Sequence, residues 1–542
     1  MKRLPKLLSI LAVPLMALQL NCSASGDDAN CEGAKCDDND DIEVSPCDAL
    51  TNDRSGRNLQ GSIPGRFGDP LAMLVLRAGD TCPTSFSDVM AKLRETDAEG
   101  CTDERSGIGT MVVSETSQIL GEADSYRLVT TRACNNRKRE DLMFSLFGVG
   151  ANAKQLPEDV EVMAFDESKG IYNYYTLEGG EWNYFGDSHD MLSGPGEGGD
   201  KRCANCHTGG GLVMKELHTP WLHWEGHMDT PGAQTLVTNN PDLGTKSSGS
   251  TMESLVKAGN RKWNTTRVAM LQETGTVKDL LRPLFCTVEI NVDNGADFES
   301  PPTGEAGGSE MSRIPRDFLL DPALGGFGSV TVEFSDYQNL LTANNQRVAD
   351  FSGRAMQNKD GETLVDTVFD FVFPERAEAD MDYVNKLKDA GVIDEDFIKD
   401  VLMVDFTRPI FSSTRCDLLE LAPDMDAADA NPTSLREGFI ANLEATSPSA
   451  GSIKGVFLSH LQNTDDSGDH SSRVSAFVDA CKARDSGEFL TDAMRVVSLT
   501  RNEARQLHVF EFAASMPVDD QNVASGTRFH PDTCELTTRF SN

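Results

Sequence analysis

The sequence has few long apolar runs. The most extended one lies near the N-terminus, at residues 7–20, and Pro14 and Gln19 interrupt it. A helix that spans a bilayer needs about 20 consecutive apolar residues. The sequence therefore predicts no membrane-spanning helix.

Basic residues are also scarce. The 542 residues include 49 Lys and Arg against 86 Asp and Glu, which gives a formal net charge of -37. Nucleic acid and anionic lipid surfaces repel a chain this acidic, so neither is expected as a partner. The charge keeps an exported protein in solution, and it also suits a basic partner such as a small cationic electron carrier.

Several catalytic signatures are missing. The sequence contains no P-loop, no G-x-S-x-G element and no tandem repeat. It therefore does not predict P-loop phosphoryl transfer, the nucleophile elbow of serine hydrolases or a solenoid. Because no acid–base constellation can be recognised either, the sequence leaves open whether the protein is an enzyme.

The N-terminus predicts export. Three basic residues among the first six precede the apolar run, an order typical of a secretory signal peptide, here residues 1–22. Cys22 and the acidic tract behind it resemble the lipid-modified cysteine of bacterial lipoproteins, and ordinary cleavage near Ser25 is the alternative. We expect a protein of the periplasm, or an outer-membrane or cell-surface lipoprotein, of a Gram-negative bacterium.

The cysteines point to the same compartment. With Cys22 set aside as a lipid anchor and Cys203 and Cys206 as one motif, ten of the 13 cysteines remain. These are Cys31, Cys36, Cys47, Cys82, Cys101, Cys134, Cys286, Cys416, Cys481 and Cys534. An even set in an oxidising compartment predicts up to five disulfides, whose pairing the spacing does not give.

The segment Gly199–Gly211, GDKRCANCHTGGG, carries the clearest chemical signal. Covalent haem attachment needs two thiols for thioether bonds and an imidazole directly after the second thiol to reach the iron. Cys203 and Cys206 would form the thioethers, and His207 would be the proximal ligand. We therefore expect one covalent haem c, which the glycines at 209–211 would let the backbone approach closely.

The sequence does not fix the sixth iron ligand. Met214 and His218 follow His207 most closely, while His189 and Met191 come shortly before the motif. A methionine ligand raises the reduction potential and favours electron transfer, whereas an open position favours chemistry on a small ligand. We expect Met214 or His218.

Two other chemistries fit the cysteine pair less well. A zinc site would use Cys203, Cys206, His218 and His223, with a spacing slightly short of the usual pattern and with His207 left unused. A redox dithiol needs a strand before it and a helix after it, whereas glycine-rich sequence flanks this pair.

Apolar periodicity separates a strand-rich early part from a helical late part. Residues 125–134, 140–150 and 159–188 are predicted as strands, the last of these as a meander. Later, apolar residues recur at helical spacing, as they do in residues 435–443, and residues 256–285 are predicted as mainly helical with breaks near Gly275 and Pro283. The predicted fold class is α+β, with a β-rich haem-bearing domain followed by a mainly helical C-terminal region.

The predicted organisation has five parts. They are a signal peptide at 1–22, an acidic Cys-containing tether at 23–55, a β-rich c-type haem domain with a helical extension at 56–290, a linker at 291–311 and a mainly α-helical domain at 312–542.

The strand-rich segment and the motif together resemble a known family. A β-rich stretch, the aromatic strand GGEWNYFG and then CANCH are similar to the cytochrome c′-beta family, which includes hydroxylamine-oxidising cytochromes with a lysine–haem cross-link. The resemblance covers roughly residues 125–208. It implies that Cys203, Cys206 and His207 hold the haem. More broadly, the chain resembles an exported bacterial monohaem c-type cytochrome.

Three functions follow from these features. Electron transfer through the covalent haem, with a redox partner protein, is favoured because the motif alone suffices for it. The alternative is a haem enzyme that acts on a small nitrogen or oxygen species, such as hydroxylamine or nitric oxide, at an open iron site. A second alternative is a structural or binding lipoprotein in which a haem or zinc site is incidental.

Overall fold

A computed structural model describes the chain at residues 47, 51–57, 59, 63–96, 101, 105, 107–114, 126–134, 137–148, 156–192, 202–205, 207–213, 231–288, 290–293, 311–314, 316–325, 328, 330–333, 335–336, 339, 373–462, 470–507 and 523–540. Tertiary contacts divide the chain between Ile42 and Glu43, and every described residue belongs to the second unit. The predicted signal peptide and Cys22 lie outside the described residues. The four predicted boundaries between the five parts stay predictions.

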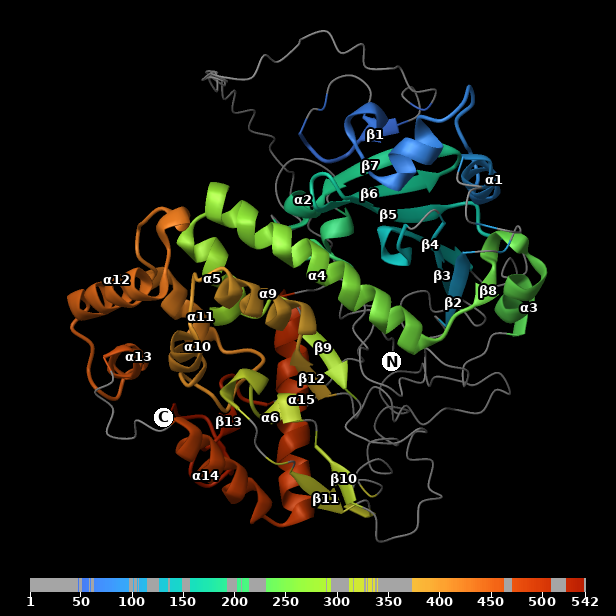
Figure 1. The fold of residues 1–542 in the computed structure, drawn as a ribbon. Helices are drawn as coiled ribbons and strands as arrows, with labels where there is room; N and C mark the ends of the chain where they lie inside the picture. Colours follow the sequence, from blue (N-terminus) through green and yellow to red (C-terminus); the bar gives the residue numbers. More distant parts are fainter. Residues whose placement is uncertain are drawn as a thin grey trace, which may run out of the picture. The chain divides into compact units, whose positions relative to one another are not determined.

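Eight strands form one mixed sheet (Figure 1). In spatial order they are β1 (Thr51–Asp53), β7 (Glu181–Asp187), β6 (Ile171–Glu178), β5 (Val160–Asp166), β4 (Leu142–Gly148), β3 (Tyr126–Arg132), β2 (Ile108–Ser114) and β8 (Thr245–Lys246). Strands β2 to β7 form an antiparallel meander, and β1 and β8 pair in parallel with its two ends. The strands predicted within residues 125–188 are confirmed, while β1 comes from sequence that we assigned to the tether.

The centre of the sheet is buried on both faces. All residues of β6 except its last are buried, because helices pack on either side. Tyr175 faces a core that includes α1 (Phe86–Thr96), whereas Tyr172 and Tyr174 face a core that includes α4 (Gly249–Thr274). The aromatic side chains of β6 therefore contribute to two hydrophobic cores, one on each face of the sheet.

The later part of the chain is mainly helical and builds one further hydrophobic core. Its helices are α5 (Val277–Phe285), α6 (Arg316–Leu319), α9 (Glu378–Asp389), α10 (Glu395–Leu402), α11 (Ser413–Asp417), α12 (Pro432–Ala445), α13 (Ile453–Leu461), α14 (His470–Lys482) and α15 (Ser486–Leu507). In α12 the predicted stripe Leu435, Phe439 and Leu443 is buried, and Asn431 caps the helix N-terminus. The predicted α+β class is confirmed.

Short elements complete the described part. Three antiparallel pairs join β9 (Ile290–Asp293) with β12 (Phe373–Arg376), β10 (Met311–Arg313) with β11 (Thr331–Glu333), and β13 (Arg528–Phe529) with β14 (Leu536–Thr537). Two helices, α2 (Ser188–Leu192) and α3 (Pro231–Asn239), flank the haem-type motif in sequence. Since β9 takes in residues 291–293, regular structure extends into the predicted linker.

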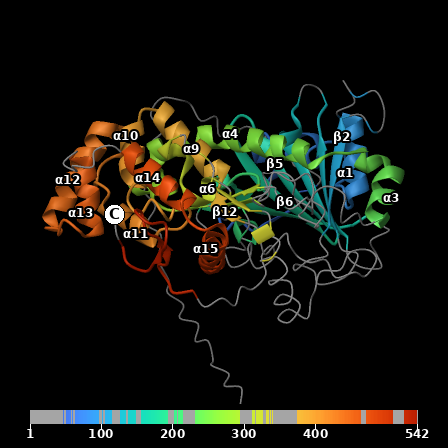
Figure 2. The same ribbon diagram turned by 90° about the horizontal axis from the view of Figure 1, so that it is seen from below.

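Helix α4 packs both against the sheet and in the helical core. Its residues Val256 and Trp263 are buried against the sheet, and Val268 is buried in the helical core. In Figures 1 and 2 the helix extends from the sheet to α9, to which it is fixed by the Asn264 side chain, 2.8 Å from the carbonyl oxygen of Ala379. One helix therefore contributes to the packing of two cores.

The predicted break near Gly275 is confirmed, and the one near Pro283 is wrong. Helix α4 ends at Thr274 with Gly275 as its C-cap, and the Thr276 side chain caps α5, which continues through Pro283 to Phe285. A proline removes one backbone hydrogen bond from a helix. Near the end of α5 this loss is offset by the burial of its apolar side chains, among them Leu284 and Phe285.

Four disulfides are formed by the described cysteines. They are Cys47–Cys82, Cys101–Cys134, Cys286–Cys416 and Cys481–Cys534. Cys31 and Cys36, the remaining two of the predicted ten, lie outside the described residues. Disulfides persist in oxidising compartments, so these bonds are consistent with the predicted export, which stays a prediction. None of the described helices combines the length and apolar character that a bilayer crossing requires.

A buried carboxylate anchors the turn that packs on the sheet. Asp69 is fully buried, and it accepts hydrogen bonds from the Ala72 amide at 2.9 Å, the Asn173 side chain at 2.9 Å and the Tyr175 hydroxyl at 2.7 Å. Burial raises the pKa of Asp69 to about 6, although these hydrogen bonds oppose the rise.

This pKa predicts a pH dependence of stability. The folded-state pKa of Asp69 lies above its unfolded value, so its contribution is present below about pH 4 and is lost as pH rises through about 6. Between about pH 4 and about pH 7, the free energy of unfolding of the wild type should fall by up to about 3 kcal/mol relative to that of Asp69→Asn. Urea titrations at each pH measure this difference, and parallel pH profiles would contradict it.

Candidate functional site

The haem-type motif lies at the sheet face that α4 covers. Cys203 is part of a 3-10 helix, Arg202–Asn205, and is half-buried beside the same core as Tyr174 and Trp263. The backbone amide of His207 donates to the Cys203 carbonyl at 2.9 Å, so these two residues are one turn apart. Cys206 lies outside the described residues.

The His207 ring is held by one backbone carbonyl. Its Nδ1 is 2.9 Å from the carbonyl oxygen of Gly211, and the Tyr174 hydroxyl donates to the same oxygen at 3.3 Å. The Tyr174 and His207 rings are 5.1 Å apart between centroids. Since a carbonyl oxygen only accepts, Nδ1 carries a proton, and in the neutral ring the lone pair is on Nε2.

Helix α4 fixes the loop after the histidine. The Trp263 indole donates to the Gly209 carbonyl at 2.7 Å, and the Asn260 side chain donates to the Leu212 carbonyl at 3.1 Å. These two residues are three positions apart and share one face of the helix. The loop that carries the His207 acceptor is therefore bound to the helix at two points.

The glycines after the motif allow the loop to pack closely against α2 and α4, because a side chain would not fit there. Gly210 has φ +73°, and a Cβ built there would lie 2.5 Å from the Ser188 carbonyl and 3.1 Å from the Trp263 ring. A Cβ at Gly211 would lie 2.3 Å from the Asn260 side chain. The sequence predicted close backbone approach to a cofactor, and the structure shows close approach to protein.

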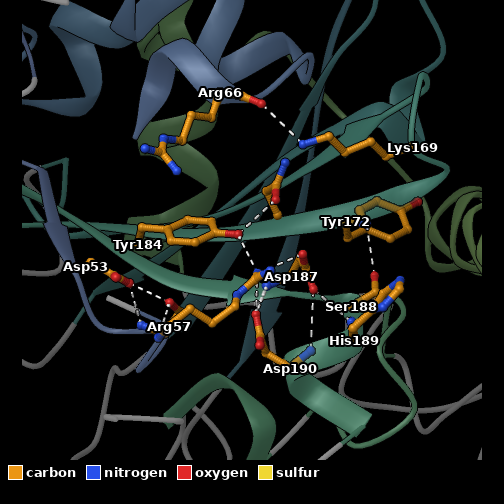
Figure 3. A network of polar contacts seen from close by, with 12 residues as sticks. Asp53, Arg57, Arg66, Lys169, Tyr172, Tyr184, Asp187, Ser188, His189 and Asp190 are labelled. Atoms are coloured by element: carbon orange, nitrogen blue, oxygen red, sulfur yellow. Dashed lines mark hydrogen bonds and ion pairs between the residues drawn. The ribbon is translucent and has the colours of Figure 1, made fainter. Parts of the chain in front are cut away.

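A polar network adjoins the same loop (Figure 3). Arg57 reaches across the end of the sheet and forms ion pairs with Asp187 at 2.7 Å and Asp190 at 2.5 Å, and it donates to the Tyr184 hydroxyl at 3.2 Å. In Figure 3 both carboxylates point at the guanidinium. Helix α2, which carries Asp190, is the element whose Ser188 carbonyl meets Gly210.

Several titratable groups in and beside this network have shifted pKa values, among them Asp190 and His189. Burial and then the neighbouring Asp187 charge raise the pKa of Asp190. Burial lowers the pKa of His189, whose ring lies 5.7 Å from the Trp263 ring between centroids. A raised carboxyl pKa is a feature of groups that carry protons in functional sites, although structural ion pairs produce it as well.

Sequence reasoning missed this network. Arg57 and Asp187 are 130 positions apart, and no motif links them. A local signal exists only for Asp187 and Asp190, because Asp187 accepts from the backbone amides of His189 and Asp190 at the start of a short helix. The arginine that completes the network is brought in by the parallel pairing of β1 with β7.

The structure places only some of the predicted ligands. Met214 and His218, the predicted sixth ligands, and His223 of the zinc alternative lie outside the described residues. Met191 is fully buried in the sheet core, and His189 is half-buried on α2. Within the described ranges, no group of three or more His, Cys, Asp or Glu side chains could hold a metal ion.

Comparisons with known proteins give no further identification. No family model, no curated protein and no solved structure matches this chain.

The described residues fit a proximal iron ligand. An imidazole that binds a metal characteristically donates its other ring N–H to a backbone carbonyl or a carboxylate, which fixes the tautomer and the ring orientation. His207 makes this contact with Gly211, whose carbonyl Tyr174 also holds. This contact leaves the lone pair of the neutral ring on Nε2, the nitrogen that could bind a metal.

The loop geometry predicts that two glycine substitutions lower the free energy of unfolding by different amounts. Gly210→Ala should lower the free energy of unfolding by roughly 3 kcal/mol, because both the positive φ and the Ser188 carbonyl oppose a side chain. Gly179→Ala is the matched control: its φ is +57°, but no atom lies within 4 Å of the added Cβ, so we expect roughly 1 kcal/mol. Urea denaturation measures both, and equal losses would contradict the close packing of the loop.

Proposed function

We propose that this chain is an exported monohaem c-type cytochrome that transfers electrons to or from a partner protein. The observation that carries the proposal is the contact between His207 Nδ1 and the Gly211 carbonyl, within a C-x-x-C-H sequence. That contact leaves the lone pair of a neutral imidazole on Nε2, the atom that an iron ligand needs.

The roles of the residues follow from this contact. Cys203 and Cys206 would form the thioethers and His207 would be the proximal ligand, with Met214 or His218 as the sixth ligand. Haem c supplies one-electron iron chemistry when it is bound. Trp263 and Asn260 hold the loop backbone, and Tyr174 positions the carbonyl that orients His207.

The charge of the chain suggests the partner. A formal net charge of -37 favours encounter with a basic protein, such as a small cationic electron carrier. Four disulfides support an exported location, and a lipid anchor at Cys22 would attach the protein to a membrane.

The polar network favours a second candidate function. Asp190 has a raised pKa and lies on the helix that packs against the motif loop. A carboxyl of this kind can hold a proton beside a reacting ligand. The second candidate is therefore a haem enzyme that acts on a small nitrogen or oxygen species.

The optical spectrum tests the proposal. For protein made with the cytochrome c maturation machinery, we expect a sharp reduced α-band, haem that stays with the chain after acid extraction, and no spectral shift with carbon monoxide. A carbon monoxide shift would favour the enzyme instead, because it requires an open iron position. Absence of covalent haem would overturn both candidates.

Paired cysteine variants give the matched control. The double variant Cys203→Ser with Cys206→Ser should lose covalent haem completely. The variant Cys101→Ser with Cys134→Ser also removes two cysteines, but it takes them from a disulfide and should keep the haem.

The Gly211 carbonyl predicts an effect of Tyr174 on the reduction potential. Tyr174→Phe removes a hydroxyl that shares the Gly211 carbonyl with His207, so the His207 hydrogen bond should strengthen and the imidazole should become more basic. A more basic ligand stabilises the oxidised iron, so the midpoint potential should become more negative.

Redox titration of the purified protein measures this shift. Tyr383→Phe is the control, because the Tyr383 hydroxyl also donates to a backbone carbonyl, that of Leu280 at 3.2 Å, but in the helical core. A potential that moves equally in both variants, or not at all in Tyr174→Phe, would rule out the role of Tyr174.

A further inference from the structure

Residues 523–540, which include the hairpin of β13 and β14, pack against α15 and form an open pocket with it. The pocket has a volume of about 740 Å³, and it is lined by Arg495 of α15 and by residues from the segment 523–539. Small organic ligands occupy pockets of roughly 300–1,000 Å³. The space is therefore large enough for such a ligand.

The wall of the pocket is fixed to the helical core. The disulfide Cys481–Cys534 attaches the hairpin to α14, and the Arg484 side chain donates to the Cys534 carbonyl at 2.7 Å. Phe529 of β13 is buried, and its ring lies 5.8 Å from that of Phe489 on α15 between centroids. A pocket that is formed before a ligand arrives avoids the cost of ordering its walls on binding.

The charged side chains of the lining are all positive. They are the guanidinium groups of Arg495 and Arg539, and no carboxylate lines the pocket. Arg495 pairs with Asp492 at 3.3 Å, but the other oxygen of that carboxylate pairs with Arg484 at 2.9 Å. Since two guanidinium groups share one carboxylate, the pocket is positively charged in a chain whose formal net charge is -37.

Arg539 is the lining residue with the most capacity to bind an anion. Its backbone amide donates to the Thr537 hydroxyl at 3.1 Å, which orders the turn. Its side chain is exposed, and among the described residues it has neither a hydrogen-bond acceptor nor an ion-pair partner. The N–H groups of its guanidinium are thus available to a ligand.

The mixture of side chains defines the class of ligand. A guanidinium forms paired hydrogen bonds with two oxygens of a carboxylate or a phosphate. Thr538 adds a hydroxyl donor to the lining, while Val523 and Leu536 provide apolar surface. This combination suits an anionic group that is attached to an apolar body.

We propose that this pocket binds a small organic anion through its carboxylate or phosphate oxygens. Arg539 supplies the main contact, because Arg495 already shares Asp492 with Arg484. The apolar part of the ligand lies on Val523 and Leu536. The lining includes no residue of the C-x-x-C-H motif, so this proposal is independent of the haem proposal.

Calorimetric titrations of the full-length chain with benzoate, phenyl phosphate and benzamide test the pocket. At low ionic strength at least one of the two anions should bind to a single site. Neutral benzamide, which has the shape of benzoate without its charge, should bind at least about tenfold more weakly than the tighter anion. The tighter anion identifies carboxylate or phosphate as the preferred group. Binding of neither anion, or binding of benzamide as tight as that of the tighter anion, would overturn the proposal.

An arginine variant locates the binding. Arg539→Gln should weaken binding of the tighter anion by about tenfold, because hydrogen bonds to a charged group are lost. Arg282→Gln is the matched control, since Arg282 is an exposed arginine of α5 in the same half and outside the lining, and it should bind as the wild type does. Equal affinities of the wild type and Arg539→Gln, or equal weakening in both variants, would rule out this site.

Two readouts separate binding from folding. The unfolding temperature of Arg539→Gln without ligand should match that of the wild type, because this side chain contacts no described residue through a hydrogen bond or an ion pair. In wild type labelled with ¹⁵N-arginine, the tighter anion should shift the Nε signal that is missing from the spectrum of Arg539→Gln. If that signal does not move at saturating anion, the proposal is wrong.

Discussion

The architecture depends on the hydrogen bonds that two side chains of helix α4 donate to the loop after His207. Trp263 and Asn260 donate to the carbonyls of Gly209 and Leu212, on either side of the carbonyl that orients His207. The same helix continues into the helical core, where Val268 is buried. A displacement of α4 would therefore change both the backbone of the loop after His207 and the packing of the helical core.

The sheet supports this loop from the other side, and both faces of the sheet are buried. Tyr174 of β6 reaches the motif loop on one face, while its neighbour Tyr175 reaches the buried Asp69 on the other. Successive residues of a strand point to opposite faces, so the two tyrosine hydroxyls reach partners in different cores. Polar groups in the core are thus placed by strand geometry, and hydrogen bonds offset the cost of burying them.

The sequence predicted the elements better than the sites. Helix α12 and the strands β3 to β7 follow from local periodicity, which depends on neighbouring residues only. The His207 motif is also local, so its residues could be named. Arg57 with Asp187, and Asp400 with His460, lie 130 and 60 positions apart, and such pairs depend on tertiary packing that one sequence does not reveal. The disulfide pairing could not be predicted from the sequence for the same reason.

Backbone carbonyls select the tautomer of two histidines in this structure. The Gly211 carbonyl accepts from Nδ1 of His207, and the Asp400 carbonyl accepts from Nδ1 of His460, so the lone pair of each neutral ring is on Nε2. The same contact therefore occurs with and without a cysteine pair beside the histidine. For His207 it is the adjoining C-x-x-C sequence, together with this contact, that supports the proposed haem ligand.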